Sequence, residues 1–272
     1  MSEMSQLTDR DALSLHRARA KPDALFLHHE ALADVQGRLS LVKKSFHSVA
    51  VVSPFAEVWR PAFPDAKIVP DHEVLDLAED THDLVIHALS LHWSNDPVGQ
   101  LIQCRRALKP DGLLLVAALG GETLHELRAA FGQAEVEVLG GLSPRVVPMG
   151  EIRDLGALLQ RAGLALPVAD SAMLTTSYAS PLHLMQDLRA MGETNALSSR
   201  IKSFTRRAVL MRAMEIYAES FATDDNRVRA TFELITLTGW APDASQPQPL
   251  RPGSATQRLA DALNTQETPL KD

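Results

Sequence analysis

Several polar side chains of this 272-residue chain follow strongly apolar segments, at positions suited to binding or catalysis. His92-Trp93 comes after the apolar run 83–89, and Gly120-Gly121-Glu122 comes after the run 112–119. A histidine can act as an acid, a base or a ligand near neutral pH, and a carboxylate can pair with a cation. Two adjacent glycines let a backbone approach another group closely. The alternative is structural: the aromatic pair packs its loop onto a helix, and Glu122 caps the next helix.

A second group of polar residues lies further along the chain. Arg145 lies in the segment 140–164. Glu193 and Asn195 belong to the segment 187–196, DLRAMGETNA, where polar side chains could face a ligand. Arg189 and Glu193 are four residues apart, a spacing that is also typical of a surface ion pair on a helix. The candidate substrate-binding residues are therefore His92, Trp93, Gly121, Glu122, Arg145, Glu193 and Asn195.

The segment 83–119 predicts the element order that positions the first group. Residues 83–89 are too uniformly apolar for a half-exposed strand, which indicates a strand buried on both faces. Asp96-Pro97 can cap and begin a helix over 98–108, and 109–112 (KPDG) predicts a tight turn. Residues 112–119 then form a second buried strand. A strand, a helix and a parallel strand in this order predict an α/β sheet with a right-handed crossover.

The whole pattern predicts a Rossmann-like α/β fold. We expect a seven-stranded, mostly parallel sheet with helices on both faces and only the last strand antiparallel. Residues 74–77 are expected to supply one strand, and Thr8 or Asp9 is expected to cap the first helix. We expect one domain over 1–272, made of N-terminal helices 9–42, a sheet core 48–176 and 229–240, an inserted helical cap 181–221 and an extended tail 241–272.

Composition limits the class of protein. A content of 45% hydrophobic and 22% charged residues is ordinary for a globular protein, and the net charge of −7 argues against a nucleic-acid surface. Cys104, the single cysteine, excludes an intrachain disulfide and is expected in the core. No apolar run approaches the ~20 residues that span a bilayer, so we do not expect this chain to be an integral membrane protein. The acidic residues among the first twenty argue against a secretory or mitochondrial leader, so a cytoplasmic protein is expected.

The same residues carry a resemblance to a known family. The strings DLVIHALSLHW and ALKPDGLLLVA resemble the fourth and fifth strands of class I S-adenosylmethionine-dependent methyltransferases. GGETLHELR (120–128), GGLSPRVVPMGEIRDLGALLQRAGL (140–164), DLRAMGETNA (187–196) and RPGSAT (251–256) resemble motifs of the methyltransferase-fold assembly factors of respiratory complex I. That similarity runs from Leu7 to Thr256. It implies the methyltransferase fold and a protein substrate or partner, because mitochondrial members of that family are credited with hydroxylating an arginine of a complex I subunit.

The chain departs from the methyltransferase pattern after its first strand, 48–53. A glycine-rich loop is expected there, because glycines let the backbone approach the methionine part of the cofactor. This sequence has Pro54, Phe55 and Trp59 instead, and it has no glycine between Gly37 and Gly99. We therefore expect Phe55 or Trp59 to fill part of the usual methionine site.

The resemblance implies S-adenosylmethionine as the cofactor and a set of residues that would bind it. These residues are Ser53, Asp71, His87, Ala88 and Leu89. Asp71 follows the short strand 67–69, where a carboxylate can hold ribose hydroxyls, although the pattern favours a turn aspartate beside a proline at least as strongly. Asp76 is a weaker candidate for the same role. His28-His29 cannot both face one ion from a helix, so we assign no metal site, and the sequence identifies no catalytic residue.

Two functions remain open from the sequence. One is an enzyme that uses S-adenosylmethionine or hydroxylates arginine, and the other is a non-catalytic assembly factor that kept the fold and lost the glycine loop. In both cases the expected partner is a protein, such as a subunit of the respiratory NADH dehydrogenase. A guanidinium of that partner could pair with Glu122 or Glu193 in a cleft between the strand ends and the helical cap.

Overall fold

A computed structural model describes residues 6–247, 257 and 259–266. The chain divides into two compact units, Met1–Pro242 and Asp243–Asp272, and the second contains the short helix α9 (Leu259–Ala262). The RPGSAT motif at 251–256 lies outside the described residues. The expected division into core, cap and tail stays a prediction.

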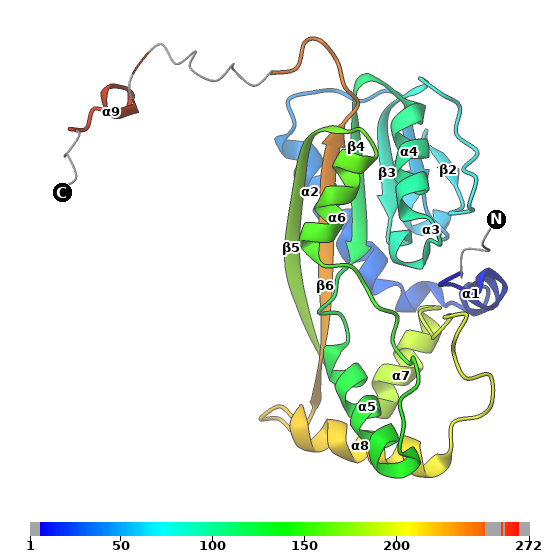
Figure 1. The fold of residues 1–272 in the computed structure, drawn as a ribbon. Coiled ribbons are helices and arrows are strands. Elements are labelled where there is room, and N and C mark those ends of the chain that lie inside the picture. Colours follow the sequence, from blue (N-terminus) through cyan, green and yellow to red (C-terminus); the bar gives the residue numbers. More distant parts are fainter. Residues whose placement is uncertain (1–5, 248–256, 258, 267–272) are drawn as a thin grey trace. The chain divides into compact units, whose positions relative to one another are not determined.

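The first unit is built on a single mixed sheet (Figure 1). Its six strands run in the order β2-β1-β3-β4-β6-β5, and within this sheet only β6 is antiparallel to its neighbours. The strands are β1 (Val49–Val52), β2 (Lys67–Val69), β3 (His82–Ala88), β4 (Leu108–Leu119), β5 (Ala165–Tyr178) and β6 (Val228–Trp240). The predicted Rossmann-like methyltransferase fold is therefore confirmed.

The predicted number of seven strands is wrong, because residues 74–77 form no strand. The backbone N–H of Leu75 donates to the side-chain Oε1 of Gln103 at 2.8 Å, and the N–H of Leu77 donates to the carbonyl of Leu75. These bonds use the donors that a strand ladder needs. The segment 109–112, predicted as a turn, lies within β4 but interrupts its pairing: Leu108 pairs with His82 and Leu113 with Leu84, and Asp111 has a left-handed φ of +58°.

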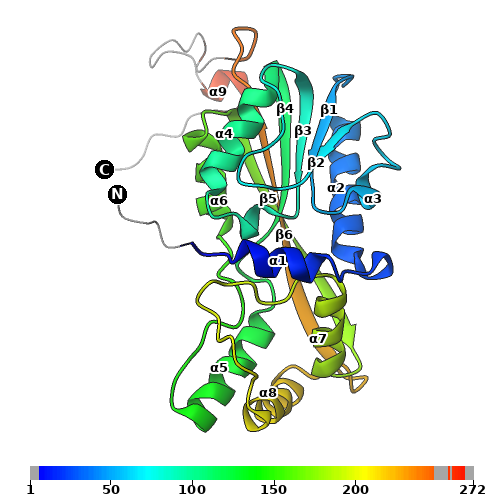
Figure 2. The ribbon, with the colours of Figure 1, turned by 90° about the vertical axis from the view of Figure 1, so that its right-hand side faces the viewer.

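Helices cover both faces of the sheet, as predicted (Figure 2). Helices α2 (Phe26–Leu41) and α3 (Ala56–Trp59) lie on one face, and α4 (Pro97–Ala107) and α6 (Ile152–Arg161) lie on the other. Each face has its own apolar core. Trp59 and Phe232 belong to the first core, whereas Leu101 and Cys104 belong to the second.

Local sequence signals explain where several helices begin and end. The side chain of Asp9 accepts a hydrogen bond from the N–H of Ala12 and caps α1 (Arg10–Arg17), as expected. Asp96 caps α4 in the same way, ahead of Pro97. Gly163 follows α6 with φ +78°, a left-handed conformation that stops the helix at little steric cost.

Three helices lie beyond the carboxyl ends of β3 and β4 (Figures 1 and 2). They are α5 (His125–Leu139), α7 (Pro181–Ala190) and α8 (Arg207–Ser220), and α5 packs against α8. The 3-10 helices η1 (Pro22–Ala24) and η2 (Leu91–Trp93) precede α2 and follow β3. Within the described ranges, no helix has both the length and the apolar character needed to cross a membrane.

Candidate functional site

A pocket of about 490 Å³ opens beyond the carboxyl ends of β3 and β4, where open α/β sheets bind ligands. Its walls come from α2, α5, α7, β6, the end of β4 and the loops around them. Most of the lining is apolar and includes Leu27, Leu119, Leu124, Leu127, Phe131, Met149, Leu188 and Phe232. The polar groups are fewer: Trp93, Thr123, Arg145, Arg189, Glu193, Thr194, Asn195 and Thr205.

Glu193 supplies the carboxylate of this pocket. It follows Gly192, whose φ of +79° turns the chain back after α7. The Oε2 atom of Glu193 accepts a 2.7 Å hydrogen bond from Nε1 of Trp93 and lies 3.4 Å from Nε2 of His92. The side chain is only 12% exposed, and Oε1 accepts no hydrogen bond from the described residues.

The charge of Glu193 is strongly stabilised. Burial alone would raise the pKa of this carboxyl, but the hydrogen bonds from His92 and Trp93 and the charges of His92 and Arg17 outweigh burial. They lower the pKa of Glu193 to about 2. The pocket therefore holds a buried negative charge with one oxygen left for a ligand.

The other predicted pocket residues are already engaged within the chain. Arg145 donates from Nε and Nη2 to Oε1 of Glu135, at 2.8 and 2.6 Å, and from Nη1 to the Thr205 hydroxyl at 2.7 Å. Asn195 donates from Nδ2 to the carbonyl of Pro144 and accepts from the N–H of Leu197. These two residues hold the pocket wall in place and have little capacity left for a ligand.

A much smaller cavity of about 10 Å³ adjoins Glu193 and has room for about one water molecule. His28, Leu89 and His92 line it. Nδ1 of both histidines is buried and has no hydrogen-bond partner among the described residues. Burial lowers the pKa of His28 to about 4, so this ring is neutral at physiological pH.

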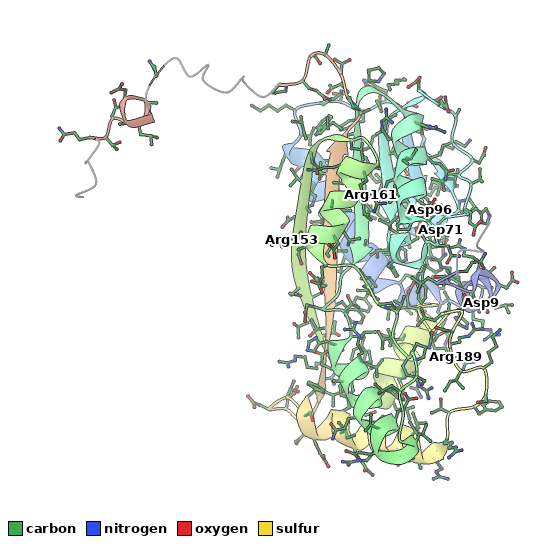
Figure 3. All side chains as sticks on the ribbon, in the orientation of Figure 1. Asp9, Asp71, Asp96, Arg153, Arg161 and Arg189 are labelled. Atoms are coloured by element: carbon green, nitrogen blue, oxygen red, sulfur yellow. The ribbon has the colours of Figure 1, made fainter. Side chains whose placement is uncertain are left out.

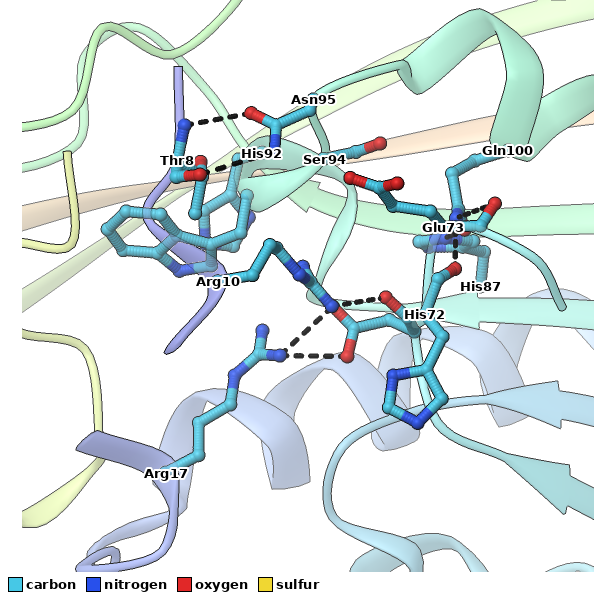
Figure 4. Close-up of polar contacts among 12 residues, drawn as sticks. Thr8, Arg10, Arg17, His72, Glu73, His87, His92, Ser94, Asn95 and Gln100 are labelled. Atoms are coloured by element: carbon cyan, nitrogen blue, oxygen red, sulfur yellow. Dashed lines mark hydrogen bonds and ion pairs between the residues drawn. The ribbon is translucent and has the colours of Figure 1, made fainter. Parts of the chain in front are cut away.

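Asp71, the candidate ribose ligand, is used by helix α1 instead. Arg17 donates to its Oδ1 at 2.8 Å and Arg10 to its Oδ2 at 3.2 Å, and Figure 4 shows the guanidinium groups of Arg10 and Arg17 close to one another. Asp71 is buried, which alone would raise its pKa, but the two arginines outweigh burial and lower it. Its carboxylate is therefore occupied by the chain itself.

The loop after β1 is partly filled by its own side chains, and Pro54 and Phe55 line a further pocket of about 570 Å³ that Arg10, Arg17 and Asp71 also border. Ser53 accepts a hydrogen bond from the N–H of Phe55 at 3.2 Å, and the buried Phe55 ring packs edge-on against His28. Trp59 is fully buried and stacks on Phe63. Both aromatic side chains lie inside the protein, and their occupation of a methionine site stays a prediction.

The remaining candidate cofactor residues, His87, Ala88 and Leu89, are buried at the carboxyl end of β3. Nε2 of His87 is 3.2 Å from Oε1 of Gln100, and burial lowers the pKa of His87. Ala88 and Leu89 are buried, and Leu89 has the unusual φ of +45°. His87 and Ala88 contact neither the large pocket nor the small cavity.

Gly121 and Glu122 lie outside the pocket lining. The side chain of Glu122 is 56% exposed, and its N–H donates to Oε2 of Glu233 at 3.0 Å. A Cβ atom at Gly121 would lie 2.7 Å from Oε1 of Glu151, an exposed side chain that can move aside. The expected ion pair between Arg189 and Glu193 is also absent among the described residues: Glu193 turns to Trp93, and Arg189 is exposed on α7 (Figure 3).

Sequence reasoning missed Arg17 and Thr205, and it considered His28 only as a metal ligand. Arg10 and Arg17 are seven residues apart, which places both on one face of a helix, but nothing in the sequence names Asp71 as their partner. Within the part of the chain that the structure describes, no group of three or more His, Cys, Asp or Glu residues is placed to hold a metal ion.

Comparison with known proteins agrees with the fold and identifies related proteins. Residues 30–116 match the family model described as a methyltransferase domain. The protein named arginine-hydroxylase NDUFAF5, mitochondrial, from Danio rerio is 40% identical over 198 residues, which are 73% of this chain and 61% of the relative. Its Homo sapiens counterpart is 39% identical over 193 residues, 71% of this chain and 56% of the relative. The chain therefore resembles the NDUFAF5 proteins and has the class I methyltransferase fold.

A solved structure supports the fold of this NDUFAF5-like chain. The YcgJ protein from Bacillus subtilis matches with a TM-score of 0.50 and 12% identity, over 80% of this chain and 100% of that protein. The chain spans about 60% of the length of the NDUFAF5 relatives from Danio rerio and Rattus norvegicus.

The expected cytoplasmic location is wrong by the same comparison, because the names of the NDUFAF5 relatives place them in mitochondria. The expectation rested on acidic residues near the N-terminus. A charge pattern in that segment is weaker evidence than identity of about 40% over most of the chain.

Proposed function

We propose that this methyltransferase-like chain captures a protein segment by receiving one of its arginine side chains at Glu193, in the assembly of the respiratory NADH dehydrogenase. The observation that carries this function is the Oε1 atom of Glu193, an acceptor that has no hydrogen-bond partner among the described residues and lies in a mostly apolar pocket. A guanidinium presents several donors in one plane and pairs well with a buried carboxylate. Its aliphatic stem would contact apolar lining such as Leu188 and Phe131.

The NADH dehydrogenase as partner is supported by the NDUFAF5 resemblance, and arginine as the recognised residue is supported by the name arginine-hydroxylase of those relatives. We propose recognition of the arginine and assign no chemical step to it. The pocket of about 490 Å³ is large enough for one arginine side chain with part of its backbone.

The adenosyl cofactor implied by the methyltransferase fold does not fit the residues present. Arg10 and Arg17 already neutralise Asp71, the carboxylate that would hold the ribose. The loop after β1 presents Pro54, which has no N–H, and the buried Phe55 in place of an open glycine backbone. We therefore derive no methyl transfer and favour the capture of a protein partner.

Two measurements test this function. Calorimetric titration with S-adenosylmethionine and S-adenosylhomocysteine should give no saturable heat at millimolar ligand; micromolar binding would show that the cofactor fits after all. In a native lysate, the wild-type protein should retain subunits of the NADH dehydrogenase, identified by mass spectrometry. Glu193→Gln should lose them.

Glu122→Gln is the matched control for this capture experiment. It removes the same charge from an exposed carboxylate outside the pocket lining, so capture should stay at the wild-type level. Equal capture by wild type and Glu193→Gln, or no NADH dehydrogenase subunit retained by either, would contradict the function.

A further inference from the structure

We infer that the loop and helix start at 201–207 form a second contact surface, which selects a partner segment carrying acidic and apolar residues beside the captured arginine. This surface, the basic rim, consists of Ile201, Lys202, Phe204, Arg206 and Arg207, all of which are exposed. It rests on the proposed function and names the class of segment that the pocket takes.

The first support is the local charge. Residues 194–214 contain five basic residues and no acidic residue, in a chain whose net charge is −7. Arg200 pairs with Asp9, and Arg212 pairs with Glu137 and Glu215. Lys202, Arg206 and Arg207 form no ion pair with the described residues, so three positive charges remain on one short segment. Such a patch attracts an acidic partner and repels a basic one.

The second support is an aromatic ring left in solvent. The relative exposure of Phe204 is 101%, and that of Ile201 is 47%. A fully exposed phenylalanine forgoes the stabilisation that burial of its ring gives, and aromatic residues are enriched where partners bind. Alternation of these apolar side chains with basic ones favours a peptide that carries both apolar and acidic residues.

The third support is continuity with the pocket. Thr205 lies between Phe204 and Arg206 and lines the pocket, where its hydroxyl accepts a hydrogen bond from Arg145. Arg189 also lines the pocket, is exposed, and forms no ion pair or side-chain hydrogen bond with the described residues. When a partner segment places its arginine at Glu193, the residues that flank this arginine therefore lie beside the positive charges of Arg189 and the basic rim.

The test uses the full chain and fluorescein-labelled peptides of about 15 residues with a central arginine. One peptide has aspartate and leucine on both sides of the arginine, and a second has serine in place of every aspartate. By fluorescence anisotropy at low salt, the acidic peptide should bind about tenfold more tightly, and this preference should shrink as about 0.3 M salt screens the charges.

The triple variant Lys202→Gln/Arg206→Gln/Arg207→Gln should lose the preference between the two peptides, and Phe204→Ser should weaken both. A matched triple variant, Arg60→Gln/Arg153→Gln/Arg161→Gln, removes the same charge from exposed positions elsewhere; Figure 3 shows Arg153 and Arg161 on α6. It should keep the preference. Circular dichroism confirms that each variant is folded.

Three results would overturn the inference. The acidic and neutral peptides could bind equally, or both triple variants could behave alike. The third is that the basic rim binds vesicles of phosphatidylcholine with about 30% phosphatidylglycerol but shows no peptide preference, which would make it a lipid surface. Failure of the proposed function is distinguishable, because it appears as binding that is insensitive to Glu193→Gln, whatever residues flank the arginine.

Discussion

The indole nitrogen of Trp93 donates a 2.7 Å hydrogen bond to the carboxylate of Glu193, a residue one hundred positions away in the sequence. This bond joins η2, at the end of β3, to the turn after α7. It fixes the carboxylate at the pocket wall and helps to keep it ionised.

Replacing Trp93 with phenylalanine should therefore reduce the stability of the protein through the lost hydrogen bond and should leave no large cavity. The variant keeps an aromatic ring but removes the N–H donor, so Glu193 loses a hydrogen bond in a buried position. We expect the free energy of unfolding to fall by about 1.5–3 kcal/mol, as for other hydrogen bonds to charged groups. Urea denaturation measures this. Trp240→Phe is the control, because its Nε1 makes no hydrogen bond with the described residues, and an equal loss in both variants would argue against the bond.

Asp71 should be essential for anchoring α1. Asp71→Ala leaves the nearly buried Arg17 without its carboxylate partner, and breaking a buried ion pair in this way typically costs about 3–5 kcal/mol. Asp76→Ala, which removes an exposed carboxylate paired with Lys67, should change stability by less than about 1 kcal/mol. Denaturant titration of both variants compares them. A similar small loss in each would show that α1 is held mainly by apolar contacts.

His28 should make stability depend on pH. Its pKa is lowered from 6.5 to about 4 in the fold, so between these values the unfolded chain binds more protons than the native protein. The contribution of His28 to the free energy of unfolding is therefore fully present above pH 6.5. It is lost as the pH falls toward 4, and the loss is about 3 kcal/mol at most. His16, His82 and His87 act in the same direction. His28→Gln should have a shallower slope in denaturant titrations over this window; an unchanged slope would contradict the assignment.

Cys104 should be inert toward thiol reagents in the native protein. It is fully buried, and burial raises the pKa of its thiol to about 12, which leaves almost no thiolate at neutral pH. A colorimetric disulfide reagent should label it only after denaturant unfolds the chain. Rapid stoichiometric labelling without denaturant would show that the α4 face of the core opens readily.

The sequence predicted the sheet far better than the site. Apolar runs and caps such as Asp9 and Asp96 act locally, so they locate most strands and helices within a few residues. The strand predicted over 74–77 failed because a single side chain, Gln103, takes the N–H of Leu75. That contact is not encoded in any local pattern.

The site depends on contacts between distant segments, which a single sequence does not reveal. Glu193 was a candidate together with Glu122, and only the structure separates the buried carboxylate from the exposed one. The partners of Asp71 come from α1, sixty-one and fifty-four residues earlier in the chain. The missing glycine loop was visible in the sequence, whereas its replacement by Phe55 packed on His28 was not.

The most direct test of arginine capture measures, by fluorescence anisotropy, the affinities of two peptides for three versions of the protein. A peptide with a central arginine and its citrulline counterpart, which has nearly the same shape but no charge, are titrated with wild type, Glu193→Gln and Glu122→Gln. We predict that wild type and Glu122→Gln prefer the arginine peptide by about 30-fold, equivalent to roughly 2 kcal/mol for a buried charge pair, and that Glu193→Gln loses this preference. Equal affinity of the wild type for both peptides, or a preference that survives in Glu193→Gln, would contradict the account.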